Sequence, residues 1–163
     1  MAAGSTYTPL ATTTVSGTST TSITFNSFSG YTDLVIISQF KSTTSSIQMQ
    51  FNGDTGANYS STRIYGYGTG YASDRLTNVN QIDFSIGGTS EWGMTIANIQ
   101  NYSNSTTYKT CIMRLSNPAD TGAEAQSSLW RNTNAITSIT VKQSGAGYFN
   151  AGSTFTLYGI VAA

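Results

Sequence analysis

Ile47-Gln48-Met49-Gln50-Phe51 is the stretch that decides the fold, because apolar and polar side chains alternate along it. Alternation with a period of two places successive side chains of a β-strand on opposite faces, one buried and one outward. The pattern recurs in four further segments: Ile82, Phe84 and Ile86 against Asp83 and Ser85; Trp92, Met94 and Ile96 against Gly93 and Thr95; Cys111, Met113 and Leu115; and Phe155, Leu157 and Val161. The sequence therefore predicts a structure dominated by strands.

Strand candidates and turn formers follow one another along the whole chain. The apolar run Leu34-Val35-Ile36-Ile37 predicts a central strand covered on both faces. Weaker strand candidates are Thr8 to Val15, Ser22 to Phe25, Arg63 to Tyr67, Ser128 to Arg131 and Ile136 to Val141. Turn formers separate them at Ser29-Gly30, Asn52-Gly53-Asp54, Gly66 to Gly70, Gly87-Gly88, Asn117-Pro118 and Gly145-Ala146-Gly147.

Helix content is expected to be small, since Ala119 to Gln126 is the only stretch with helix-favouring composition. We expect an all-β fold, an antiparallel β-sandwich with about ten short strands and little helix. The sandwich could be of the jelly-roll or the immunoglobulin-like kind, between which strand spacing does not choose.

The length of 163 residues predicts one domain. We expect residues 22–163 to form a single β-sandwich domain and residues 1–21 to form either an N-terminal arm or the first edge strand. An arm would add a strand to the sheet of a neighbouring subunit, with Tyr7, Leu10 and Val15 as its contact residues. The alternative is a first strand in the chain's own sheet.

Charge is scarce: seven basic and seven acidic residues make up 9% of the chain and cancel to a net charge of zero. They are scattered singly, so we expect neither nucleic acid nor a membrane surface as partner. No segment approaches 18 consecutive apolar residues, and Met1 to Thr6 lack the basic start of an export signal. A neutral surface rich in hydroxyls is only modestly soluble, so we expect a homo-oligomer.

The sequence offers little for catalysis, because it contains no histidine and a single cysteine. A Ser/His/Asp triad and a zinc site are therefore excluded, and Cys111 is interpreted as a buried strand residue. Asp54, Asp74 and Asp83 are expected to be solvated or to cap turns, and Gly66 to Gly70 to form a flexible loop rather than a phosphate site. We expect no enzymatic activity, no catalytic residue, no cofactor and no metal.

Tyrosine is the residue type with binding potential. Tyr59, Tyr65, Tyr67 and Tyr71 fall in a Gly-rich segment that we expect to be exposed, where they could bind protein or glycan. Alternatively, their rings pack over one end of a sheet or across a subunit interface. The two tryptophans are interpreted as core or interface anchors, at Trp92 and Trp130.

Four motifs occur in order along the chain: Asn52 to Tyr59 (NGDTGANY), Asn101 to Thr110 (NYSNSTTYKT), Trp130 to Ile139 (WRNTNAITSI) and Gly152 to Ile160 (GSTFTLYGI). Together they resemble a family of virion structural proteins of cyanophages and other aquatic tailed phages, from about Tyr7 to the C-terminus. The resemblance implies a role in the virion, assembled in the cytoplasm of the bacterial host. It supplies no catalytic residues.

Two places in a virion compete. The chain has no repeat, collagen-like or coiled-coil segment that would project a fibre tip. We therefore expect a capsid decoration (cement) protein, a homotrimer that binds the major capsid protein and stabilises the head shell from outside. The alternative is a tail-fibre or receptor-binding domain, with other tail proteins and a host surface glycan as partners. A carbohydrate-binding module is a third, unrelated class.

Overall fold

The computed structural model describes residues 6–44, 46–84, 91–117 and 122–161. These residues form strands joined by turns and loops, and they include no helix, hence none long and apolar enough to cross a membrane. The strands are β1 (Tyr7–Thr14), β2 (Ser22–Asn26), β3 (Asp33–Phe40), β4 (Ile47–Phe51), β5 (Tyr59–Tyr67), β6 (Gly70–Val79), β7 (Ile82–Asp83), β8 (Gly93–Gln100), β9 (Lys109–Asn117), β10 (Gly122–Trp130), β11 (Ser138–Gln143) and β12 (Thr154–Ile160).

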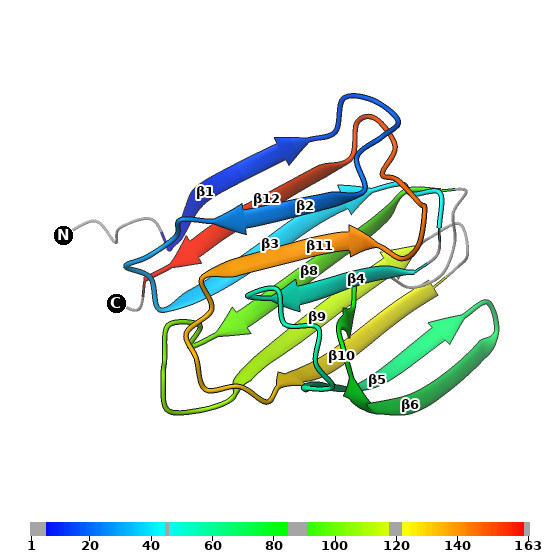
Figure 1. Ribbon diagram of the computed structural model, residues 1–163. Helices are drawn as coiled ribbons and strands as arrows, with labels where there is room; N and C mark the ends of the chain where they lie inside the picture. The colour runs from blue at the N-terminus through cyan, green and yellow to red at the C-terminus, as the bar shows by residue number, and fades with distance from the viewer. Residues whose placement is uncertain (1–5, 45, 85–90, 118–121, 162–163) are drawn as a thin grey trace.

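The strands build two sheets that pack face to face as a β-sandwich (Figure 1). The larger sheet has eight strands in the order β1-β12-β3-β8-β9-β10-β5-β6, and the smaller has four in the order β2-β11-β4-β7. Each neighbouring pair is antiparallel. The predicted antiparallel sandwich is confirmed, with twelve described strands where about ten were expected.

Part of the excess in strand number comes from residues 59–79, where the sequence predicted one short strand and a flexible loop. The segment instead forms a hairpin of the long strands β5 and β6. The loop prediction for Gly66 to Gly70 is therefore wrong. Gly68 sits at the turn with φ of +55°, a conformation that glycine adopts without strain, so the glycine serves a tight hairpin.

The core lies between the two sheets. Phe40, Phe149 and Phe155 pack against one another, with ring centroids 4.8 to 6.0 Å apart. Nearer the other end, the Trp130 ring packs against Phe51 at 5.6 Å and stacks on Tyr59 at 6.3 Å. Burial of such large side chains contributes most of the driving force for folding.

The N-terminal segment contributes an edge strand to the large sheet. Tyr7–Thr14 forms β1, which pairs with β12 as an edge strand of the chain's own sheet. The chain then turns into the sandwich at Val15, whose amide donates to the Ser153 carbonyl and whose carbonyl accepts from the Gly152 amide, both at 2.8 Å. Within residues 1–21, the first five lie outside the described residues.

Two predictions about individual strands are wrong. The helix-favouring stretch at Ala119 to Gln126 contributes its described part to β10, because hydrogen bonding to β9 and β5 on both sides overrides the local composition. In β8 the buried phase is Thr95, Ala97 and Ile99 rather than Met94 and Ile96. Thr95 tolerates burial because its Oγ1 donates to the Phe84 carbonyl at 2.9 Å.

Candidate interaction surface

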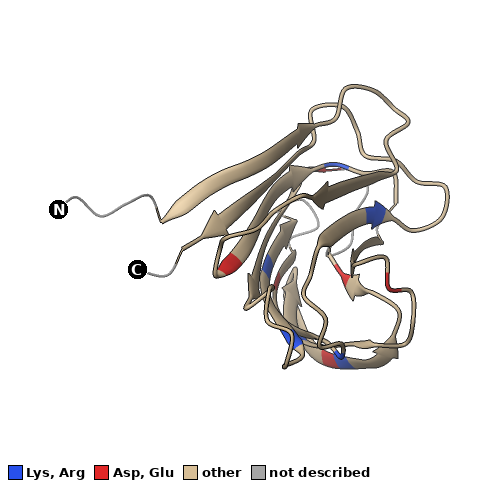
Figure 2. Ribbon diagram, turned by 60° about the vertical axis from the view of Figure 1, so that its left-hand side comes forward, with Lys and Arg blue, Asp and Glu red and all other residues tan. Residues whose placement is uncertain are grey.

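The eight-stranded sheet has one face packed on the smaller sheet and one face that no other described strand covers (Figure 2). We call the second the outer face. Alternate residues of each strand form it: Tyr7 in β1, Tyr158 and Ile160 in β12, Val35 and Ile37 in β3, Met94, Ile96 and Asn98 in β8, Ile112 and Arg114 in β9, Ala123, Ala125 and Ser127 in β10, Thr62 and Ile64 in β5, and Tyr71, Ser73 and Arg75 in β6. Leu34, Val35 and Ile36 are all buried, as the expected central strand requires, although no other described strand covers the outward side of Val35.

The outer face is apolar along its middle. Tyr158, Val35, Asn98 and Ile112 lie side by side across β12, β3, β8 and β9. The next row along the same strands is Thr156, Ile37, Ile96 and Arg114. Each row therefore carries aliphatic side chains that point away from the core.

The outward side of the smaller sheet is different in kind. The outward side chains of its three longer strands, β2, β11 and β4, are polar. They are Ser22, Thr24 and Asn26 in β2, Thr140 and Lys142 in β11, and Gln48 in β4. Two of them, Thr24 and Thr140, hydrogen-bond to each other through their hydroxyls at 3.0 Å. The chain thus places a hydrated surface on one side of the sandwich and an apolar surface on the other.

Large side chains on the outer face remain exposed to solvent. The exposed fractions are 48% for Tyr7, 63% for Ile64, 91% for Tyr71, 44% for Met94 and 50% for Ile112. They are spread across the sheet, from Tyr7 on the edge strand β1 to Tyr71 on the opposite edge strand β6, with Met94, Ile112 and Ile64 between them. We take this face as the candidate interaction surface.

A groove of about 830 Å³ runs over the outer face at its β9-β10-β5-β6 end. Its small side chains are Gly66, Ala123 and Ala125, while Ile64, Tyr71 and Arg114 are its large outward ones. Beside it lies a hollow of about 290 Å³ with a hydroxyl-rich lining: Ser60, Ser61, Thr62, Arg75, Thr110, Ser127, Ser128 and Leu129. The two together offer an apolar site next to a hydrogen-bonding one.

On the opposite side of the same strands, Arg63 of β5 holds a polar cluster. Its Nε and Nη2 donate to the two carboxylate oxygens of Asp74 at 2.6 and 2.8 Å, and its Nη1 donates to Asp83 Oδ2 at 3.2 Å. The Tyr65 ring lies against the guanidinium, with Cζ 5.5 Å from the ring centroid. Asp74 and Asp83 are thus ion-paired, not solvated or turn-capping as expected, because the hairpin places Asp74 opposite Arg63 and β7 of the smaller sheet brings Asp83 to it.

Charge and burial act in opposite directions on the carboxyl groups of this cluster. The hydrogen bonds from Arg63 lower the pKa of Asp74, whereas burial raises the pKa of Asp83. Burial also raises the pKa of Glu124 to about 7, only partly offset by the positive charge of Arg63. Glu124 Oε1 is buried without a hydrogen-bond partner, so this site favours the protonated carboxyl up to about pH 7.

Asp54 has the turn-capping role that the sequence predicts. Its Oδ1 accepts a hydrogen bond from the Gly56 amide at 2.8 Å, and its Oδ2 accepts from Trp130 Nε1 at 2.7 Å and from Asn58 Nδ2 at 2.9 Å. Partial burial would raise the pKa of Asp54, but these hydrogen bonds lower it overall. Asp54 therefore joins a surface turn to the aromatic core.

The predicted interaction residues do not gather at one place. Tyr7 and Tyr71 lie exposed on the outer face, at opposite ends of the large sheet, and Tyr7 makes an edge contact with Tyr158. Tyr65 and Tyr67 stack on each other on the other side of the hairpin, 5.9 Å apart. Two of the four expected Gly-rich-segment tyrosines, Tyr67 and Tyr71, are thus strongly exposed.

Three other candidates belong to the interior. Tyr59 is fully buried, so its predicted exposure is wrong; its hydroxyl accepts from the Phe51 amide at 3.0 Å, and burial raises its pKa to about 12. Val15 is buried in the core, and Leu10 packs against it partly buried. Both tryptophans were predicted to be core or interface anchors. Trp130 is buried in the core, whereas Trp92 is 40% exposed.

Sequence reasoning missed the residues that make the outer face apolar. Met94 and Ile96 were assigned to the core, and Ile64 and Ile112 were not singled out. One signal was present in the sequence. Ile112 lies between the buried residues Cys111 and Met113, so its side chain points outward with those of Thr110 and Arg114. An aliphatic side chain in the polar phase of a strand indicates a second face that avoids water.

The described residues hold no group of three or more Cys, Asp or Glu side chains that could bind a metal ion. Cys111 is buried, and burial raises its pKa, so its thiol is not poised to react. No known protein family matches the sequence, and no similar protein was found among curated proteins. The resemblance to virion proteins of aquatic phages therefore stays a prediction.

Proposed function

We propose that this chain is a structural protein of a bacteriophage virion, which decorates the outside of the head shell and contacts its neighbours through the outer face. The observation that carries the proposal is the contrast between the two sides of the sandwich. Tyr7, Met94 and Ile112 leave apolar area uncovered on one side only, and contact with another protein would be stabilised by covering it.

The scarcity of charge supports the same proposal. Only 9% of residues are charged, and Figure 2 shows few blue or red positions along the ribbon. Many copies can then pack closely over a shell without mutual repulsion. Decoration by this surface requires no catalytic group, which agrees with the structural roles of Arg63 and Asp54.

The experiment is to mix the purified protein with phage heads that lack it and to measure cosedimentation. Ile112→Lys places a charge in the middle of the outer face, and Thr24→Lys places the same charge on the polar side of the smaller sheet as the matched control. We expect Ile112→Lys to abolish binding and Thr24→Lys to bind as the wild type does. Equal binding by both variants would reject the outer face as the contact, and no binding by the wild type would reject decoration.

A second candidate is a tail-fibre or receptor-binding domain, which the groove favours. Tyr71 and Arg114 flank a long hollow beside a hydroxyl-rich one, and aromatic rings with hydrogen-bonding groups suit sugars. For this function, Tyr71→Ala should weaken adsorption of the phage to its host while head stability is unchanged. Unchanged adsorption would argue against it.

A further inference from the structure

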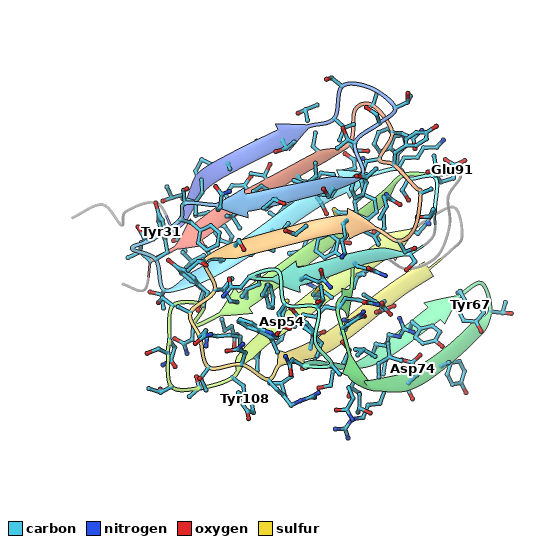
Figure 3. The ribbon with its side chains drawn as sticks, viewed as in Figure 1. Tyr31, Asp54, Tyr67, Asp74, Glu91 and Tyr108 are labelled. Carbon is cyan, nitrogen blue, oxygen red and sulfur yellow. The ribbon has the colours of Figure 1, made fainter. Side chains whose placement is uncertain are left out.

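Strand β6 forms one edge of the eight-stranded sheet and pairs, among the described strands, with β5 alone. It is ten residues long. The β5-β6 hairpin lies at the periphery of the molecule, where Tyr67 and Asp74 mark it in Figure 3. A long strand at the edge of a sheet presents a row of backbone donors and acceptors to any strand that can reach it.

The hydrogen-bonding pattern of the β5-β6 hairpin determines which amides and carbonyls of β6 point away from β5. A two-residue turn, Gly68-Thr69, joins the closing pair Tyr67 and Gly70. In such a hairpin the closing pair exchanges hydrogen bonds, and hydrogen-bonded and non-hydrogen-bonded pairs then alternate along the ladder. The residues of β6 whose amides and carbonyls point away from β5 are therefore Tyr71, Ser73, Arg75 and Thr77.

The two edges of the sheet differ in backbone features that oppose pairing. Strand β1 carries Pro9, which has no amide hydrogen, and its register shifts between Pro9 and Ala11. Both features oppose pairing with a further strand. Strand β6 contains no proline, and its pairing with β5 is regular from Gly70 to Thr77. Among the described strands, β6 is therefore the edge of this sheet whose backbone is more open to pairing.

We propose that β6 pairs antiparallel with β6 of a second copy of this chain, across a two-fold axis that passes beside Ser73. An axis perpendicular to the sheet keeps the outer faces of both copies on one side, so outer-face residues pair with outer-face residues. Centred on Ser73, the register places Tyr71 opposite Arg75 of the partner subunit, and symmetry repeats that pair.

Side-chain chemistry favours this register over those shifted toward the C-terminal end of β6. Tyr71 is 91% exposed, and Arg75 makes no hydrogen bond or ion pair with any described residue, so each has a free surface to offer. A guanidinium over a tyrosine ring is attractive. A shift of the axis to Asp74 would set two carboxylates opposite each other, and a shift to Arg75 would set two guanidiniums opposite each other, both of which are unfavourable.

The dimer joins two eight-stranded sheets into one continuous sheet and leaves the apolar outer faces free for other contacts. It therefore goes beyond decoration of a shell and does not depend on it. A two-fold contact also gives an even number of copies, in contrast to the trimer that the sequence led us to expect.

Disulfide cross-linking tests the register. Ser73→Cys places one cysteine beside the axis, where the two strands bring paired Cα atoms to about 5.5 Å, within disulfide reach. Thr77→Cys is the matched control on the same edge, four residues from the axis and far from its own symmetry mate. We expect a covalent dimer on mild oxidation for Ser73→Cys and none for Thr77→Cys or the wild type, whose Cys111 is buried. Equal cross-linking of both variants, or of neither, would overturn the register.

Solution mass tests the contact without new cysteines. We expect the wild type to be a dimer at concentrations on the order of 100 μM, Ser73→Lys to be a monomer, and Tyr71→Ala to dimerise roughly tenfold more weakly because two ring contacts are lost. Ser127→Lys, which adds the same charge to the outer face on the inner strand β10, should remain dimeric. A monomeric wild type, or an oligomer broken by Ser127→Lys but not by Ser73→Lys, would refute the pairing.

Discussion

The buried carboxyl of Glu124 gives the protein an unusual dependence of stability on pH. Its pKa in the folded protein is about 7, against an ordinary value of 4.5, because of burial. A carboxyl whose pKa rises on folding stabilises the fold fully below its unfolded pKa, and that stabilisation is lost as pH rises through the folded pKa. We therefore expect the free energy of unfolding to decrease between about pH 4.5 and pH 7.

The size of the effect follows from the two pKa values. At about 1.4 kcal/mol for each pH unit, the difference corresponds to at most about 3 kcal/mol, a large share of the stability of a domain. Asp83 acts in the same direction, and Asp74 acts in the opposite direction only as pH falls below its ordinary value of 3.8. The chain has no histidine, so no imidazole titrates in the same window.

The test is urea denaturation of the wild type and of Glu124→Gln from pH 4.5 to pH 8. Glutamine has nearly the same shape and no charge, so the variant should match the wild type at pH 4.5 and exceed its stability by up to about 3 kcal/mol at pH 8. The chain's other glutamate supplies the control, since Glu91 is exposed and Glu91→Gln should track the wild type throughout. A wild type whose stability is flat or rises from pH 4.5 to pH 7 would refute the reasoning.

Three further predictions concern the core. Gly159→Ala would drive a methyl group into the Tyr31 ring and should lower the free energy of unfolding, measured by urea denaturation, by about 1 to 3 kcal/mol. The loss should be smaller in a Tyr31→Ala background, and an equal loss in both backgrounds would contradict the contact. Trp130→Phe removes the hydrogen bond to Asp54 and should lower the free energy of unfolding by about 2 kcal/mol or more in the same assay. An unchanged free energy of unfolding would show that this hydrogen bond does not stabilise the fold. Cys111 should react with a thiol reagent only after unfolding, because burial raises its pKa; rapid labelling of the native protein would argue against its placement.

The sequence predicted the fold class and the buried phase of strands that have one apolar face. Ile47, Met49 and Phe51 are buried, as are Phe155 and Leu157. Each of these strands has polar residues in the other phase, so alternation has one interpretation. The end of the chain departs from the pattern, because β12 ends at Ile160 and Val161 is exposed.

The sequence did not reveal which face of the large sheet would be covered. Strand β8 has apolar residues in both phases, and the buried phase was decided by the hydrogen bond that satisfies Thr95 and by packing of Ala97 and Ile99 between the sheets. Such information is tertiary and is absent from local alternation. The burial of Tyr59 was missed for the same reason, since its partners Phe51 and Trp130 come from two other strands.

Part of the candidate surface was visible in the sequence. The tyrosines of residues 59–71 were identified as a group, and Tyr71 does lie exposed on the outer face. The group was split by the hairpin, because residues one apart in a strand point to opposite faces. The clustering of Arg63 with Asp74 also required the strand register, which pairs them across β5 and β6. Asp83 reaches Arg63 from β7 of the other sheet, a tertiary contact between residues 20 apart in the chain.

Cryo-electron microscopy of purified virions that contain this protein tests the central claim most directly. The account predicts many copies over the head shell, each with the outer face of its eight-stranded sheet covered by neighbouring protein and the polar side of its smaller sheet toward solvent. A few copies confined to the tail, or head-bound copies whose outer face is open to solvent, would contradict it.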